Sequence, residues 1–292
     1  MRSFGDATAT GAPLGGRILG NRGAVASEHY LSAQAGMDML MAGGNAFDAA
    51  AAATLVENLV NPHMFTIGGE CPMLLLPASQ GKVLSINGNT RAPMAATLEA
   101  FTSRGLSLIP PRGVLASGVP ACVDSLLTML EHWGSLPLSE ISTPARDLAD
   151  QGFPVHDGLV HMPLYGLKHN SARIRDEWPD SAALYLDKDS DPPLAGDMLR
   201  NPAMANFLEG LVHAGQGKDL AASCRAARSF FYEGEPAAII GDFSQTRDGL
   251  LTREDCTRFC TRIEEPQSIS TFGTRIHKCG PWSQGPVFLQ LI

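Results

Sequence analysis

The sequence lacks most of the patterns that would assign a chemistry on their own. It contains no Gly-x-Ser-x-Gly, no His-Glu-x-x-His, no Cys-x-x-Cys and no glycine-rich loop ending in Gly-Lys-Ser or Gly-Lys-Thr. The usual signatures of serine hydrolases, zinc peptidases, zinc ribbons and nucleotide-binding loops are therefore missing. We expect no bound metal and no cofactor. The six cysteines are expected to be reduced thiols, some of them buried, even at the closest spacing, Cys256 and Cys260.

Positive charge is also scarce. Lys and Arg number 22 against 30 Asp and Glu, giving a formal net charge of -8, and no basic run occurs. Such a chain gains little from counterion release on DNA or RNA, and it offers no cationic patch to a membrane surface. We therefore expect neither a nucleic acid nor a membrane as a partner.

Long apolar runs are absent as well. The most apolar stretch, residues 45–59, is interrupted by Asn45, Asp48, Glu57 and Asn58 and is too short to span a bilayer. No apolar segment of a secretory signal follows Arg2. A cytoplasmic location is the expectation, with a periplasmic one open if the N-terminus is incomplete.

What is present is the composition of a globular protein, 44% hydrophobic and 18% charged. Residues 1–22 have no periodicity and are predicted to be a loose tail, and residues 23–292 a mixed α/β unit. In its first part we predict a strand at 23–27 leading to a helix capped by Ser27. A second helix is predicted at 46–61, capped by Asn45 and buried through five alanines at 49–53.

Further along, alternating and helical patterns follow one another. Strands are predicted at 73–76 and 82–87, joined by a turn at 79–81, and at 113–118. Helices are predicted at 119–133, ended by Gly134, at 139–152 and within 202–230, and another begins with a cap at Thr252. Short helices and loops are expected over 153–200. A strand pair over 263–279 turns at Phe272-Gly273, and residues 287–292 begin a helix or strand.

Two short segments are candidates for binding a substrate. Gly68-Gly69 lies between a helix and a buried strand, where paired glycines permit positive φ and expose backbone N–H groups to an anion, although a tight packed turn explains them equally. Arg91, at the end of a glycine-flanked strand, can clamp a carboxylate, although a structural arginine is the alternative. Ser117, in a turn between strand and helix, is a third candidate, as an esterase nucleophile without evident partners.

The order of several short segments is more specific than any one of them. Ala42-Gly-Gly-Asn-Ala-Phe-Asp-Ala-Ala50, Ile67-Gly-Gly69, Arg91-Ala-Pro93, Ala116-Ser-Gly-Val-Pro120, Phe231-Tyr-Glu-Gly234 and Gly249-Leu-Leu-Thr-Arg-Glu-Asp255 follow one another in this order. With Gly23–Ser27, Ala149–Phe153 and Gly280–Gly285, this set resembles the γ-glutamyltranspeptidase family over about residues 23–292.

The resemblance implies an α+β fold of the N-terminal nucleophile hydrolase type, with stacked α, β, β and α layers. It implies a precursor that cuts itself to expose a threonine, whose hydroxyl attacks an amide while its own α-amine acts as the base. The substrate would be a small amide, with γ-glutamyl or related acyl groups. In this chain Arg91 would hold a substrate carboxylate, and Gly68 and Gly69 would shape the pocket wall.

Three departures from the family pattern qualify this reading. The Thr-Thr-His segment that marks the nucleophile does not occur in these 292 residues, so no catalytic residue is assigned. The chain is expected to be the large-subunit portion, with a C-terminal small subunit carrying the threonine as its partner. Arg91 stands two positions nearer the Ala-Pro than in the γ-glutamyl enzymes, and the glycine-rich run is reduced to Gly68-Gly69-Glu70-Cys71. Divergent acylases, or a non-catalytic scaffold on the same half-fold, are the alternatives.

Overall fold

In the computed structural model of the protein, the structure is described for residues 19–292. Of the predicted tail at 1–22, residues 1–18 therefore lie outside the described residues, and residues 19–22 form neither helix nor strand.

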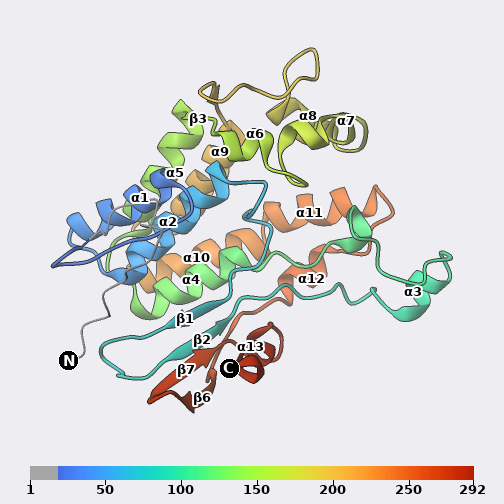
Figure 1. Ribbon diagram of the computed structural model, residues 1–292. Coiled ribbons are helices and arrows are strands. Elements are labelled where there is room, and N and C mark those ends of the chain that lie inside the picture. The colour runs from blue at the N-terminus through green and yellow to red at the C-terminus, as the bar shows by residue number, and fades with distance from the viewer. Residues whose placement is uncertain (1–18) are drawn as a thin grey trace, which may run out of the picture.

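Helices form the largest layer of the molecule and lie on one side of a small sheet (Figure 1). They pack against one another in the pairs α1–α2, α2–α5, α5–α9, α9–α10 and α10–α4. Their bounds are α1 (Tyr30–Met41), α2 (Ala46–Val60), α4 (Cys122–Trp133), α5 (Leu138–Gln151), α9 (Pro202–Ala214) and α10 (Leu220–Tyr232). The predicted helices at 46–61, 119–133, 139–152 and within 202–230 are confirmed.

Helix α2 shows why this layer packs so closely. Asn45 caps it as predicted, and Asp48 completes a capping box by accepting from the Asn45 backbone N–H at 2.8 Å. Ala51 and Ala52 are fully buried, and their small side chains let neighbouring helices approach the α2 backbone. The alanine run is thus core, as its composition indicated.

The sheet beneath the helices joins segments that are far apart in the chain. Strands β1 (Met73–Leu75) and β2 (Leu84–Asn87) form the predicted antiparallel hairpin. Strand β5 (Arg262–Glu264) then pairs antiparallel with β2, which gives the order β1-β2-β5. Ile86, at the centre of the sheet, is fully buried in the main core. The sequence pattern had not indicated that β5 joins this sheet.

The C-terminal part lies on the opposite side of the sheet from the helices (Figure 1). Strands β6 (Gln267–Thr271) and β7 (Thr274–Lys278) form the predicted hairpin, turning at Phe272 and Gly273, both with positive φ. Helix α13 (Gly285–Leu291) packs on this hairpin and resolves the open choice for residues 287–292 as a helix.

The remaining elements are short and lie around this framework. Residues 157–185 fold into three helices with a small core of their own, as the weak pattern over 153–200 predicted. Within residues 19–292, no helix combines the length and apolar character needed to cross a bilayer. The bounds are α3 (Leu98–Thr102), η1 (Val114–Ala116), β3 (Phe153–Pro154), α6 (Asp157–His161), α7 (Leu167–Glu177), α8 (Pro179–Tyr185), β4 (Met198–Leu199), α11 (Glu235–Gln245) and α12 (Arg253–Thr257).

Two predicted strands are wrong. Residues 23–27 pair with no strand; the Ser27 hydroxyl donates to Glu57 at 2.6 Å, and His29 rather than Ser27 caps α1. Residues 113–118 begin at Gly113 with φ +83° and continue as the 3-10 helix η1. A β-branched or alternating run forms a strand only where a partner backbone is available, and here neither segment has one.

The six cysteines are free thiols, three of them buried, as expected.

Candidate functional site

Arg91 lies in an extended segment that is fixed by its backbone from both sides. Its carbonyl oxygen accepts the Val119 N–H at 2.8 Å in an isolated antiparallel bridge. Three residues further on, the Met94 N–H donates to the buried carboxylate of Asp255 at 2.7 Å. The same carboxylate closes the capping box with Thr252 at the start of α12. The capped helix predicted at Thr252 therefore also positions Arg91.

The side chain of Arg91 borders an open cleft of about 320 Å³ between this segment and residues 259–262. Its guanidinium lies 5.9 Å from the centre of the Phe259 ring, and one N–H donates to the Arg258 carbonyl oxygen at 3.4 Å. Within residues 19–292, Arg91 forms no ion pair. Its positive charge is thus available to an anion in the cleft.

A second cation and an aromatic ring complete the cleft. Arg262, at the start of β5, and Trp282, before α13, both line it. The Trp282 indole N–H donates to Glu264 at 2.9 Å, and the same carboxylate accepts from the Asn87 amide at 3.2 Å. No acidic residue is among the described lining residues. Two guanidinium groups without a lining carboxylate favour a ligand that carries negative charge.

The glycines Gly68 and Gly69 do not line this cleft. Neither glycine has positive φ, so the expectation that this segment needs glycine for a positive φ is wrong. The Gly69 N–H donates to the Thr66 carbonyl oxygen at 2.9 Å and is not free to bind an anion. The Gly69 carbonyl accepts the N–H groups of Ala121 and Cys122 at 3.0 Å each, where α4 begins. Gly69 thus fixes the start of a core helix, and a role of either glycine in substrate binding stays a prediction.

A different glycine is required by close packing. Gly88 follows β2, and its carbonyl oxygen accepts the Cys71 N–H at 2.8 Å. A Cβ atom at Gly88 would lie 2.1 Å from the Cys71 carbonyl oxygen, which no side chain can tolerate. Nearby, the Asn89 amide faces the Glu70 carboxylate at 2.7 Å with its nitrogen turned toward it.

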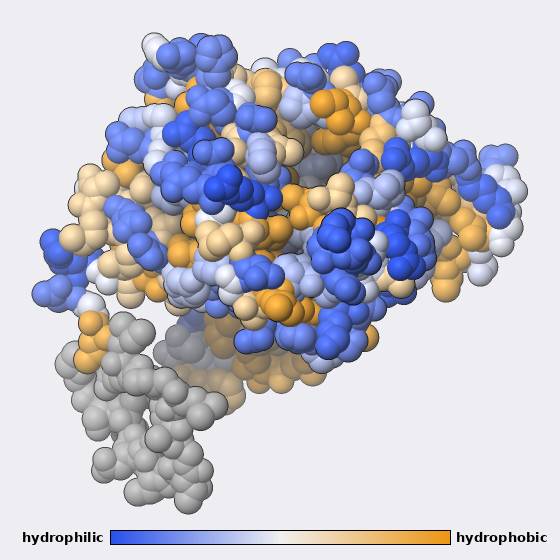
Figure 2. Space-filling view, turned by 90° about the horizontal axis from the view of Figure 1, so that it is seen from above, coloured by the Kyte–Doolittle hydropathy of each residue, from blue (hydrophilic) through white to orange (hydrophobic). Residues whose placement is uncertain are grey.

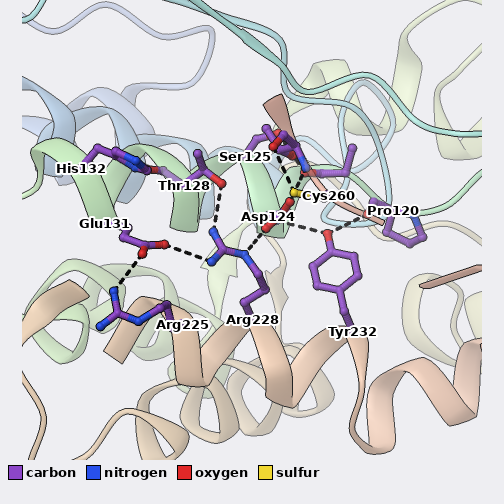
Figure 3. A network of polar contacts seen from close by, with 12 residues as sticks. Pro120, Asp124, Ser125, Thr128, Glu131, His132, Arg225, Arg228, Tyr232 and Cys260 are labelled. Carbon is purple, nitrogen blue, oxygen red and sulfur yellow. Dashed lines mark hydrogen bonds and ion pairs between the residues drawn. The ribbon is translucent and has the colours of Figure 1, made fainter. Parts of the chain in front are cut away.

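The far wall of the cleft is held by a buried network of charges (Figure 3). Asp124 on α4 is 1% exposed, forms an ion pair with Arg228 on α10, and accepts the Thr261 N–H at 2.6 Å. Arg228 also donates to Glu131 at 3.0 Å and to the Thr128 hydroxyl at 2.9 Å. The network therefore ties the backbone beside Cys260 and Arg262 to the helical layer.

Tyr232 closes the other end of the same network. Its hydroxyl donates to the Pro120 carbonyl oxygen at 2.7 Å and accepts the Asp124 N–H at 3.1 Å (Figure 3). Glu131 lies nearer the surface than Asp124 and is only partly buried. Its partial burial raises its pKa, but the hydrogen bonds and positive charges of Arg225 and Arg228 outweigh this effect, so the pKa of Glu131 is lowered overall. These groups position the site and do not face the cleft.

The most specific sequence signature, residues 42–50, is also structural. The Asp48 carboxylate is fully buried and accepts from the Ser135 N–H at 2.9 Å as well as from Asn45. A Cβ atom at Gly44 would lie 2.6 Å from the Leu136 side chain. The motif thus fastens the start of α2 to the turn before α5.

Ser117 is exposed, and within residues 19–292 no histidine or carboxylate is hydrogen-bonded to it.

Comparison with known proteins decides the family. The sequence model of the gamma-glutamyltranspeptidase family matches residues 32–292. The chain belongs to the gamma-glutamyltranspeptidase family. The resemblance seen in the ordered segments is therefore confirmed.

Other members of the gamma-glutamyltranspeptidase family agree with this over nearly the whole chain. The glutathione hydrolase-like YwrD proenzyme of Bacillus subtilis (strain 168) is 31% identical over 270 residues, which is 92% of this chain and 47% of that protein. The chain thus spans about half the length of this relative. The crystal structure of the Helicobacter pylori gamma-glutamyltranspeptidase superposes with a TM-score of 0.82 at 25% identity, covering 92% of this chain and 73% of that one.

An acylase is similar to this chain as well. The crystal structure of the cephalosporin acylase from Bacillus halodurans gives a TM-score of 0.76 at 29% identity, covering 94% of this chain and 50% of that one. These likenesses confirm the expected α+β fold of the N-terminal nucleophile hydrolase type.

Sequence reasoning found only one residue of the cleft, Arg91. Phe259, Cys260, Arg262 and Trp282 were missed because they come from segments far along the chain from Arg91. The pairing of β5 with β2 brings the first three to Arg91, and the bond from Trp282 to Glu264 on β5 brings the fourth. The sequence signal that could have found them is the alternation of Arg262-Ile-Glu264 directly after the capped helix at Thr252.

Proposed function

We propose that this chain is the substrate-recognition half of a self-processing enzyme that cleaves or transfers an amide-linked acyl group. The threonine nucleophile would be supplied by a C-terminal small subunit, because no Thr-Thr-His segment occurs in these residues. The names of the curated relatives, which include glutathione hydrolase proenzymes, support a γ-glutamyl or related acyl group as the substrate.

The observation that carries the proposal is the guanidinium of Arg91, which has no ion-pair partner within residues 19–292, at a cleft without a described acidic lining residue. The backbone of Arg91 is fixed, and its guanidinium is held at the cleft by the Phe259 ring and the Arg258 carbonyl oxygen. A bidentate arginine–carboxylate contact is among the stronger polar contacts available to a small substrate. Arg262 adds a second positive charge on the same cleft.

Apolar groups that stay exposed around the sheet support a partner subunit. In the described residues β1 and β5 are the edges of the sheet, and edge strands invite pairing with another backbone. Exposed large apolar side chains gather on these edges and on α13: Leu74, Leu76, Ile263, Val287, Phe288 and Leu291. A small subunit that covers them would complete the fold, and without it we expect the chain to aggregate.

The proposal is tested by producing the chain alone and together with the downstream half of its gene. Release of p-nitroaniline from γ-glutamyl-p-nitroanilide is measured for each. We expect activity only when both halves are present, since no Thr-Thr-His segment occurs in these 292 residues. Activity of the 292-residue chain by itself would refute the assignment of the nucleophile to the other half.

A second candidate is an acylase for a non-glutamyl group. It is favoured by the likeness to the cephalosporin acylase and by the shift of Arg91 by two positions from the γ-glutamyl pattern. Glutaryl-p-nitroanilide, which lacks the α-amine of glutamate, separates the two. Preference for the glutaryl substrate identifies an acylase, preference for the γ-glutamyl substrate a transpeptidase, and turnover of neither by the joined halves favours a non-catalytic scaffold.

Arg91 is tested in the two-part enzyme by Arg91→Ala. We expect KM to rise about ten- to a hundredfold, from the loss of a hydrogen-bonded ion pair worth about 1.5–3 kcal/mol. Arg275→Ala, on the exposed face of β7, is the matched control and should leave KM unchanged. An unchanged KM for Arg91→Ala would make Arg91 a structural residue.

A further inference from the structure

A second cleft, of about 250 Å³, opens among the short helices α6–α8. Its floor is apolar and includes Leu159, Leu167 and Ile174, which are buried in the smaller core. Trp178 and Tyr185 add aromatic surface. Because clefts for drug-sized molecules run from about 300 to 1,000 Å³, this one fits a smaller body, about one ring in size.

The charged groups of this cleft are all positive. Arg112, on an exposed loop, and Arg173, on α7, line it, and no Asp or Glu is among its described lining residues. Arg173 is oriented by the Asn170 side chain at 3.0 Å and by Glu177 at 3.8 Å. Within residues 19–292, Arg112 forms no ion pair. In a chain of net charge -8, a cleft with only cations selects an anion.

His63 brings an unmet hydrogen-bonding need to the same cleft. Both of its ring nitrogens are buried without a partner among the described residues. Burial, together with the neighbouring His156, lowers the pKa of His63, so the ring is neutral at pH 7 and keeps one N–H to donate. Burial also raises the pKa of Tyr185 to about 12, so its hydroxyl stays a donor. A buried donor without an acceptor is costly, so turning the His63 ring toward a bound carboxylate would relieve that cost.

The rim of the cleft is held in an unfavourable backbone conformation. Leu164 lines the opening with φ +73° and a side chain that is 75% exposed. Its carbonyl oxygen accepts from the Asn170 amide at 2.9 Å, which holds the turn in place. A branched residue at positive φ costs free energy, and such strain gathers at binding sites. Figure 2 looks down on the side where α7 and α8 lie in Figure 1 and shows apolar side chains around a hollow in a largely polar surface.

We propose that this cleft binds a small organic carboxylate with an apolar, ring-sized body. The apolar floor and Trp178 take the ring, while the carboxylate faces Arg112 and accepts from His63 once that ring turns its buried N–H toward the cleft. The cleft shares no lining residue with the one beside Arg91, so this ligand is additional to the amide substrate.

Isothermal titration of this chain, co-produced with the downstream half of its gene, with phenylacetate tests the proposal. 2-Phenylethylamine and benzyl alcohol serve as cationic and neutral probes of the same body. We expect saturable binding of phenylacetate and at least about tenfold weaker binding of the other two. Arg112→Glu should weaken phenylacetate binding by about tenfold or more, since it reverses the free charge at the rim. Lys188→Glu, the same charge reversal on an exposed loop, is the matched control and should leave binding unchanged.

A second variant addresses the cavity itself. Ser181→Trp on α8 fills the cleft and should abolish binding while the far-ultraviolet circular dichroism stays that of the unchanged chain. The proposal is overturned if phenylacetate does not bind saturably, if the amine binds as well as the acid, or if Arg112→Glu and Lys188→Glu have equal effects. Retained binding in a folded Ser181→Trp variant would likewise refute it.

Discussion

Replacing Arg228 by methionine is the most direct test of how the wall of the Arg91 cleft is held. The substitution keeps an unbranched apolar chain about as long as the aliphatic part of arginine but removes the charge that pairs with Asp124. Asp124 is 1% exposed, so its carboxylate cannot turn to water when Arg228 is lost. Its remaining bond with Thr261, at 2.6 Å, is to a neutral donor.

The magnitude follows from this burial. Removing one partner of a buried ion pair costs about 3–5 kcal/mol, because the other charge stays buried and uncompensated. Arg225 makes a comparable bond to Glu131 at 2.9 Å, but its side chain is 57% exposed. An exposed pair of this kind contributes about 0.2–1 kcal/mol. Arg225→Met is therefore a matched control on the same helix.

The assay is urea unfolding of both variants, each co-produced with the downstream half of the gene and followed by tryptophan fluorescence. We expect Arg228→Met to lower the free energy of unfolding by about 3–5 kcal/mol and Arg225→Met by about 1 kcal/mol or less. The double variant Asp124→Asn/Arg228→Met should recover part of the loss, because a neutral amide needs no counterion and still accepts from Thr261. Equal effects of the two arginine variants, or a double variant no more stable than Arg228→Met, would show that buried charge does not hold this wall.

Three further predictions concern pH and packing. The pKa of Glu131 is lower in the folded state, so its carboxylate stabilises the fold above about pH 4.5, and this stabilisation is lost as pH falls through the pKa of the folded state. The difference in free energy of unfolding between the unchanged chain and Glu131→Gln should therefore shrink on acidification. A difference that stays constant in urea unfolding contradicts this. The pKa of His63 is lowered in the folded state, which therefore favours the neutral ring. The fold keeps its full stability above about pH 6.5 and loses stability below it, because the unfolded chain takes up the proton more readily. His63→Gln should reduce the loss of thermal stability between pH 7 and pH 5. Gly88→Ala should lower the free energy of unfolding by about 1–3 kcal/mol, or more if the backbone at Cys71 cannot move. Gly68→Ala should change it by about 0.5 kcal/mol or less, because the nearest atom lies 3.7 Å from the added Cβ. Urea unfolding that ranks the two variants the other way contradicts the packing argument.

The sequence by itself determined the local elements that have strong local signals. Asn45 and Thr252 each begin a helix because their side chains accept backbone N–H groups two or three residues on, which depends on nearby residues alone. The hairpins at 73–87 and 267–278 follow from short turns between alternating runs. The ordered short segments also determined the family, since each preserves a local packing or capping need, as Gly44 and Asp48 illustrate.

Only the tertiary structure decided what surrounds Arg91 and what the glycines do. Residues 23–27 and 113–118 have the composition of strands, but a strand needs a partner backbone that local sequence cannot supply. The sequence left Gly68 and Gly69 as either an anion site or a tight packed turn, and the structure adds that neither has positive φ and that Gly69 bonds to the start of α4. The cleft of Arg91 exists because β5 crosses to β2 and because Asp124 and Arg228 hold Thr261. Those contacts join residues more than a hundred positions apart, and no local pattern encodes them.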